Sequence, residues 1–203
     1  MKTKERILVK ALELFNNEGV KEVTLRKVAG ALGISQGNLN YHFKTKGEII
    51  RQLYYDLVDQ MNDAMQQLTR EQPILSYLSK SSLISMEVLY AYRFITRDLY
   101  QVLESDQELK QHYHQLQKMR NEQFLSLFQH MISGGLMREE ELVGEYERLH
   151  ERMNILGDNW ISAADFFQGE SLSKVAHYHA LLFEIIYPYL TPKGKEQYLE
   201  IAT

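Results

Sequence analysis

Apolar residues recur at the three- and four-residue spacing of amphipathic helices along most of the chain. In the first segment, Ile7, Ala11 and Phe15 fall on one helical face, and Gly19 follows as a helix stop. No segment is predicted to form a strand. The pattern therefore predicts an all-α fold, with helices at residues 2–18, 24–32, 35–43, 46–68, 73–89, 91–104, 106–133, 141–168, 171–189 and 193–202.

The second and third predicted helices are short and lie close together in the sequence. Thr24 precedes the first of them and Ser35 precedes the second, and both residue types favour the N-cap position. Gly33, between the helices, supplies a helix stop. Two short helices joined by a turn of about three residues are typical of a helix-turn-helix, whose second helix enters the major groove of DNA.

The third predicted helix is polar on the side that would face DNA. Its apolar positions, Ile34, Leu39 and Phe43, are expected to anchor the helix to its domain. Amide side chains can pair with adenine edges, while hydroxyl and imidazole groups can reach phosphates. The residues left to point outward are Gln36, Asn38, Asn40, Tyr41 and His42. Three small helices with an ordinary polar surface would give the same spacing.

The N-terminal quarter of the chain is basic, although the chain as a whole is acidic. Residues 1–50 contain nine basic and five acidic side chains, which leaves 14 basic and 22 acidic ones in the remainder. A basic segment followed by an acidic body favours a polyanionic partner for the first and a different role for the second. A chance imbalance on solvated faces is the other interpretation.

The composition excludes several functional classes. The chain has 203 residues, of which 44% are hydrophobic and 25% charged, as in ordinary globular proteins. With no cysteine, it has no disulfide, no thiol nucleophile and no thiolate metal site. The G-x-S-x-G pattern at residues 33–37 follows a predicted helix, whereas a hydrolase needs a strand there. We therefore expect no catalytic residue, no metal and no cofactor.

Three runs in this region carry a resemblance to a known family. They are TLRKVA at residues 24–29, LGISQGNL at residues 32–39 and YHFKTK at residues 41–46. The runs resemble the DNA-binding domain of the TetR/AcrR transcriptional regulators over residues 4 to about 53. Members of this family are all-helical homodimers, usually repressors, with an N-terminal operator-binding domain and a C-terminal inducer-binding domain. The resemblance implies a helix-turn-helix DNA-binding domain at residues 1–45 and a helical ligand-binding and dimerisation domain at residues 46–203.

The resemblance also implies roles for single residues. The positions at which the family contacts bases are occupied by Arg26, Gln36, Gly37 and Asn40. The positions at which it contacts phosphates, or packs beside them, are occupied by Thr24, Asn38, Tyr41, His42 and Lys46. Ser35 joins this set as the cap that opens the recognition helix. Because the family most often has tyrosine at the place of Asn40, that residue either contacts adenine directly or leaves backbone contact to Tyr41.

The remainder of the chain is dense in aromatic and methionine residues. Such a stripe commonly forms a core, yet tyrosine hydroxyls in an apolar body also suit a small-molecule cavity. The resemblance favours the second interpretation, a pocket for an unidentified inducer. The residues expected to line it are Tyr90, Phe94, Tyr113, Phe128 and Trp160.

The last two long helices, at residues 141–168 and 171–189, are where the family dimerises. Several apolar and small residues on them could supply a close helix contact, or could pack inward in a monomer. These residues are Ile155, Trp160, Ala163, Ala164, Ala176, Leu182, Phe183 and Ile186.

Together these observations predict a sequence-specific DNA-binding regulator, a ligand-responsive repressor that acts as a homodimer on a pseudo-palindromic operator. A helical adaptor that docks another protein without binding an operator is the alternative, and a small helical enzyme is a second one. Residues 1–6 show no apolar signal region, and no segment has the roughly 20 apolar residues of a membrane span. We therefore expect a cytoplasmic protein without a membrane partner.

Overall fold

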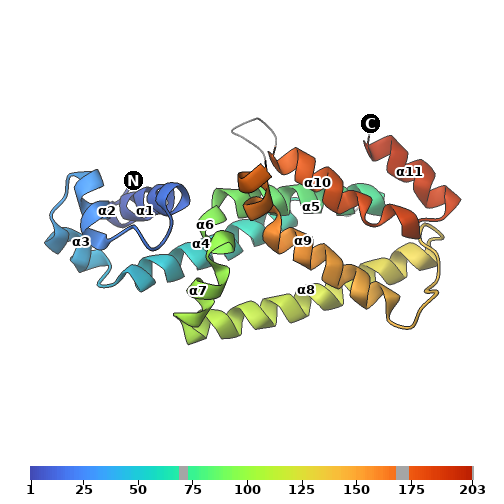
Figure 1. Cartoon of the computed structure of the whole chain (residues 1–203), viewed down its shortest axis with the longest axis horizontal. Coiled ribbons are helices and arrows are strands. Elements are labelled where there is room, and N and C mark those ends of the chain that lie inside the picture. Colours follow the sequence, from blue (N-terminus) through green and yellow to red (C-terminus); the bar gives the residue numbers. More distant parts are fainter. Residues whose placement is uncertain (69–72, 168–173, 203) are drawn as a thin grey trace. The chain divides into compact units, whose positions relative to one another are not determined.

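The computed structural model describes residues 1–68, 73–167 and 174–202, and within these ranges its regular elements are helices (Figure 1). In chain order they are α1 (Thr3–Glu18), α2 (Leu25–Leu32), α3 (Gln36–His42), α4 (Lys46–Gln66), α5 (Ile74–Ala91), α6 (Arg93–Arg97), α7 (Leu99–Glu104), α8 (Gln107–Ser133), α9 (Glu145–Phe167), α10 (Lys174–Glu184), the 3-10 helix Tyr187–Tyr189 and α11 (Pro192–Ala202). The predicted all-α fold is confirmed. None of the described helices combines the length and apolar character needed to cross a bilayer.

The chain forms two compact units. Unit 1 comprises Met1–Asn62 and Val88–Gln111, and unit 2 comprises Asp63–Glu87 and His112–Thr203. Lys46 begins α4 inside unit 1, so this structural division differs from the functional boundary expected between residues 45 and 46. That functional boundary stays a prediction.

Three predicted helices differ from the structure by more than two residues at one end or are interrupted. The expected helix at residues 91–104 is interrupted at Tyr92 and Asp98, and it forms α6 and α7 instead. The helix expected from residue 141 begins at Glu145, after a bend and the positive φ of Gly144. The helix expected at residues 171–189 gives way to a 3-10 turn around Pro188, because proline cannot donate the backbone hydrogen bond of a helix interior. Ser171, the first residue of that expected helix, lies outside the described residues.

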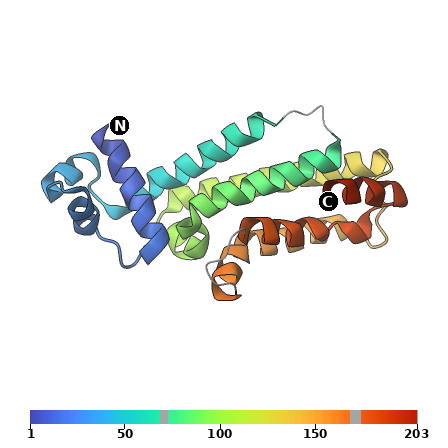
Figure 2. The ribbon, with the colours of Figure 1, turned by 90° about the horizontal axis from the view of Figure 1, so that it is seen from above.

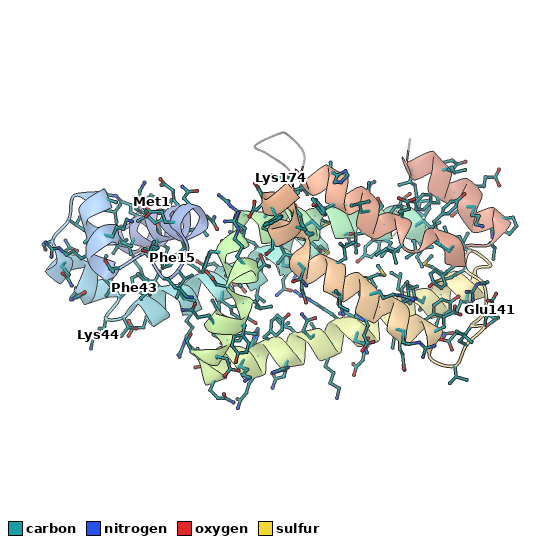
Figure 3. The ribbon with its side chains drawn as sticks, viewed as in Figure 1. Met1, Phe15, Phe43, Lys44, Glu141 and Lys174 are labelled. Carbon is teal, nitrogen blue, oxygen red and sulfur yellow. The ribbon has the colours of Figure 1, made fainter. Side chains whose placement is uncertain are left out.

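The core of unit 1 is made by apolar faces whose spacing is visible in the sequence. Figure 2 shows α1, in dark blue, beside the short helices α2 and α3. Phe15 and Phe43, labelled in Figure 3, are 1% and 4% exposed, and Leu39 of α3 is fully buried. Burial of each large apolar side chain contributes roughly 1.5–3 kcal/mol. This burial, rather than helix propensity, holds the short N-terminal helices in place, because α2 and α3 have only eight and seven residues.

Asn16, a buried polar residue near the end of α1, explains the break between α5 and α6. Its amide Nδ2 donates a 2.8 Å hydrogen bond to the carbonyl oxygen of Ala91, the last residue of α5. Its Oδ1 accepts a 3.1 Å hydrogen bond from the backbone N–H of Phe94, in the first turn of α6. Free backbone groups at helix ends need such partners when they are buried. One side chain therefore satisfies two helix ends that are more than 70 residues away in the sequence.

In unit 2, α8 runs toward the intervening turn and α9 runs back from it, so the chain follows the two helices in opposite directions (Figure 1). The ring of Phe128 lies 5.6 Å from that of Tyr146, and the ring of Phe124 lies 4.7 Å from that of His150. Residues later in α9 therefore face residues earlier in α8. The turn contains Gly134 and Gly135, and Gly135 has a φ of +70°.

The C-terminal segment of unit 2 is hydrogen-bonded to this same turn. Thr191 donates through its backbone N–H to the carbonyl oxygen of Leu136, at 3.0 Å, and through its hydroxyl to that of Gly135, at 2.7 Å. Gly194 of α11 then passes directly against the Leu136 carbonyl. A Cβ at residue 194 would collide with that oxygen and would stand 3.2 Å from the Cβ of Leu190. Only glycine allows this approach of α11 to the turn.

We expect Asn16→Ala to lower the free energy of unfolding by about 1–3 kcal/mol, because it leaves the buried backbone N–H of Phe94 without a partner and removes the part-buried hydrogen bond to Ala91. Urea unfolding measures this change. Asn17→Ala is the matched control, since Asn17 is exposed and makes one side-chain hydrogen bond, from Arg93 at 3.2 Å. Equal effects of the two substitutions would show that Asn16 does not hold the break between α5 and α6.

Gly194→Ala is expected to lower the free energy of unfolding by about 2 kcal/mol or more, because the added methyl group overlaps backbone atoms that cannot turn aside. Gly157→Ala, where a Cβ would meet nothing within 4 Å, is the control and should leave stability unchanged or improve it. A thermal unfolding midpoint for Gly194→Ala at or above that of the unsubstituted protein would contradict this account.

Candidate nucleic-acid interface

The predicted helix-turn-helix is formed by α2, a tight turn and α3. The Thr24 hydroxyl accepts a 3.2 Å hydrogen bond from the backbone N–H of Lys27, which caps α2. Gly33 ends α2 with a φ of +67° in the left-handed region, and the Ser35 hydroxyl accepts a 3.1 Å hydrogen bond from the backbone N–H of Asn38. The three roles predicted for these residues as caps and stop are confirmed.

The inner side of α3 fixes the orientation of the helix. Leu39 is fully buried, Phe43 is 4% exposed and Ile34 is half-buried, so the apolar positions predicted as anchors face the core of unit 1. The ammonium of Lys4, on α1, lies 5.5 Å from the ring centroid of Phe43, at the edge of this contact. The opposite side of α3 therefore faces solvent.

The outer side of α3 carries the polar residues that the sequence predicts for DNA contact. Gln36, Gly37, Asn38, Asn40 and Tyr41 are all exposed, and Tyr41 keeps 85% of its surface accessible. Among the residues that the structure describes, the side chains of Gln36, Asn38 and Asn40 have no hydrogen-bond partner. His42 is half-buried, and its ring meets that of Tyr41 edge-on at 5.2 Å. The arrangement can offer amide donors and acceptors to base edges and a phenol to a phosphate.

The two ends of this surface carry the other predicted residues. Arg26 is exposed on the first turn of α2, without an ion pair to any described side chain. Lys46, on the first turn of α4, is half-buried, and its ammonium donates a 2.6 Å hydrogen bond to the carbonyl oxygen of Val20. Lys46 thus has an internal partner that the sequence did not indicate. Two donors of its ammonium remain for a phosphate.

One local feature of the site was missed in the sequence. The Thr45 hydroxyl accepts a 3.2 Å hydrogen bond from the backbone N–H of Glu48, and the Glu48 carboxylate accepts one of 2.8 Å from the backbone N–H of Lys44. This pattern closely resembles a capping box, whose signal is the T-x-x-E spacing at residues 45–48. It fixes the start of α4 directly after α3.

Most cations of the basic segment remain available on the surface. Lys10 pairs with Glu13, and Lys27 pairs with Glu18 at the end of α1. The exposed basic residues that form no ion pair with the described part of the chain are Lys2, Lys4, Arg6, Lys21, Arg26 and Lys44. Figure 3 labels Lys44 at the periphery of the N-terminal helices. Free cations around an exposed polar helix provide the electrostatic attraction that a DNA backbone requires.

The five residues predicted to line a ligand pocket are divided between the two units. Tyr90 and Phe94 belong to unit 1, where Phe94 is 1% exposed and its ring lies 5.1 Å from that of Phe15. Tyr113, Phe128 and Trp160 belong to unit 2, where the last two are fully buried and Tyr113 is half-buried. Their role in ligand binding stays a prediction.

Some of the residues expected at a dimer contact pack inside the protomer instead. This group consists of Trp160, Ala164, Leu182, Phe183 and Ile186, each of them buried. Ile155, Phe166 and Leu181 lie on α9 and α10 and are 67%, 83% and 41% exposed. Large apolar side chains left in water along two neighbouring elements are typical of a protein contact surface.

Two family models match the chain. Residues 7–53 match the model described as "Bacterial regulatory proteins, tetR family", and residues 56–198 match the model described as "Bacterial transcriptional repressor". The second match alone covers more than half of the chain.

Individual relatives agree with these matches. The HTH-type transcriptional repressor KstR2 of Mycolicibacterium smegmatis is 29% identical over 99 residues, which cover 47% of this chain and 48% of that protein. The HTH-type transcriptional regulator AcrR of Shigella flexneri is 35% identical over 52 residues, or 26% of this chain and 24% of that protein. The matched segments thus span half or less of these curated relatives. A solved TetR-family transcriptional regulator from Marinobacter aquaeolei VT8 is 26% identical to this chain. The two structures superpose with a TM-score of 0.88, and the match covers all of this chain and 98% of that one.

Proposed function

The chain belongs to the TetR family of bacterial transcriptional regulators, a non-enzymatic class, and on that premise we propose that it is a cytoplasmic, ligand-responsive repressor. In this proposal two copies bind one pseudo-palindromic operator through the exposed side of α3. The DNA-binding domain is residues 1–45, and residues 46–203 bind an inducer and a second copy of the chain.

The observation that carries the proposal is the contrast between the two sides of α3. The inner side is buried through Leu39 and Phe43, whereas the amide side chains on the outer side form no hydrogen bond within the described structure. Gln36 and Asn40 would contact bases together with Arg26, since amides pair bidentately with adenine and guanidinium with guanine. Contacts to phosphates would come from Thr24, Ser35, Asn38, Tyr41, His42 and Lys46, through side chains or through the backbone N–H groups at helix starts.

Gly37 supports a close approach of this surface to a partner. A Cβ there would meet only the Ser35 hydroxyl, at the ordinary contact distance of 3.9 Å, so the fold itself does not require glycine. Glycine in an exposed helix costs up to about 1 kcal/mol relative to alanine. Gly37 therefore lowers helix stability although no neighbouring atom in the fold requires glycine, and this supports a position that lies directly against DNA.

Dimerisation would bring two recognition helices into successive major grooves, about 34–36 Å apart. The exposed Ile155, Phe166 and Leu181 support a contact between copies through α9 and α10. A ligand that binds one arrangement of the dimer more tightly would shift the population toward it, and operator affinity would fall if the helix separation no longer fits. The expected lining residues Tyr90, Phe94, Tyr113, Phe128 and Trp160 remain part of this proposal.

We expect the double substitution Gln36→Ala with Asn40→Ala to remove most of the sequence preference, leaving only the base contact of Arg26. The test uses a site selected from random double-stranded DNA and a scrambled site of equal length. Each lost bidentate pair should reduce the preference roughly 5- to 150-fold. Unchanged preference would contradict base contact by this side of α3 and would favour the adaptor alternative if all DNA binding proved weak.

Lys46→Ala is the companion variant in that experiment. It should weaken binding to both DNAs alike and lower the slope of log affinity against log salt by about 0.9, as expected for one lost phosphate contact. Because Lys46 also donates to Val20, urea unfolding of the variant is measured in parallel. A changed sequence preference would contradict the role assigned to Lys46.

Gly37→Ala is expected to maintain or raise the free energy of unfolding while it weakens operator binding by about tenfold or more, because the methyl group separates α3 from the DNA. Gly30→Ala, on exposed α2 with nothing within 4 Å of its Cβ, is the matched control and should leave affinity unchanged. Equal affinities of the two variants would mean that the helix does not approach DNA closely at Gly37.

A further inference from the structure

A row of polar side chains lies where α9 faces α8 inside unit 2. His150, Asn154 and Asp158 are four residues apart on α9, so they share one side of the helix. Phe124 of α8 touches His150, and Arg120 lies one turn earlier on α8. Since the two helices run in opposite directions, Arg120 faces the later part of this row. Burial raises the pKa of Asp158, and the positive charge of Arg120 offsets part of that rise.

His150 has a buried nitrogen without a partner. The residue is 2% exposed, and its Nε2 has no hydrogen-bond partner among the described residues. Its Nδ1 lies 3.3 Å from the side-chain nitrogen of Asn154. Burial lowers the pKa of His150, so the ring is neutral near neutral pH, and a donor at Nδ1 places the ring proton on Nε2. The result is a buried N–H group that is free to donate to an acceptor, a costly arrangement in a folded protein.

Asp158, two turns further along α9, is a hydrogen-bond acceptor, whereas Nε2–H of His150 is a donor. It is half-buried, and neither it nor Arg120 forms a hydrogen bond or a close ion pair within the described part of the chain. Tyr113 contributes a half-buried hydroxyl beside them, which accepts a 2.6 Å hydrogen bond from Gln117. A carboxylate with reduced hydration and no donor lacks one partner that a ligand can supply. Eight residues of helix separate it from His150 by about 12 Å.

We propose that this side of α8 and α9 binds a neutral, mainly apolar molecule with a carbonyl oxygen at one end and a hydroxyl group about 12 Å away. The carbonyl accepts from Nε2–H of His150, and the hydroxyl donates to Asp158. The half-buried ring of Phe124 covers the imidazole of His150 in the structure. In the proposed complex this ring rotates away from the imidazole and packs on the apolar part of the ligand. Arg120 disfavours a cation beside Asp158, and Asp158 disfavours an anion. The inference rests on the ligand response in the proposed function.

The test uses linear probes of about this length: an eleven-carbon ketone with a hydroxyl at the far end, the ketone without the hydroxyl, and the alcohol without the carbonyl. Trp160, the single tryptophan of the chain, lies on α9 and reports binding by fluorescence, and calorimetry gives the affinity. The hydroxy-ketone should bind at least tenfold more tightly than either probe that lacks one oxygen. No binding, or equal affinities for the three probes, would overturn the inference.

Two variants assign the two ends. His150→Leu should lose at least tenfold in affinity for both ketones and none for the alcohol, and its urea midpoint should rise because an unpaired polar group is removed. Asp158→Asn should lose affinity for the two hydroxyl-bearing probes only. Glu147→Gln, exposed on the same helix, is the control and should change none of these values. Equal losses for every probe would indicate a structural effect and would overturn the assignment.

Operator binding is measured separately, so that the two proposals fail independently. If the hydroxy-ketone binds with the expected selectivity but leaves operator affinity unchanged, the site stands and the ligand response of the proposed function fails. If the protein binds a selected operator but none of the probes, the inference about this site fails and operator recognition stands.

Discussion

The side chain of Asn16 joins α1 to the end of α5 and the start of α6 within unit 1. Its amide accepts from the buried backbone N–H of Phe94 in α6, which would otherwise have no partner, and donates to the last carbonyl of α5. Arg97 adds a 2.8 Å hydrogen bond to the carbonyl oxygen of Asn16 itself. These contacts join the end of α1 to a segment that follows it by about 75 residues. Helix α1 therefore packs on α6 as well as on α2, and α2 in turn packs on α3.

The recognition surface depends on that support because α3 has seven residues and cannot be stable alone. Its stability comes from the caps at its start, the buried Leu39 and Phe43, and the hydrogen bonds that begin α4 directly after it. Each of these interactions lies on the inner side or at the ends. The outer side is thereby left free for amide, phenol and glycine positions that serve no packing role.

Local features of the fold and the site could be predicted from the sequence. Helix caps and stops act over three or four residues, so Thr24, Gly33 and Ser35 were identified from their neighbours alone. Long-range contacts left no such signal. The break at Tyr92 depends on Asn16, and the glycine at residue 194 depends on the Leu136 carbonyl, which no periodicity reveals. The same limit applies to the expected pocket, because aromatic spacing does not tell a core residue such as Phe94 from a ligand contact.

In the proposed function, the exposed sides of two α3 helices bind one symmetric site on DNA. Hydroxyl-radical footprinting of the full chain on a site selected from random double-stranded DNA tests it most directly. We expect two protected patches related by two-fold symmetry, with centres one helical turn, about 34–36 Å, or a multiple of it apart. A single patch without symmetry, or protection that does not depend on sequence, would contradict it.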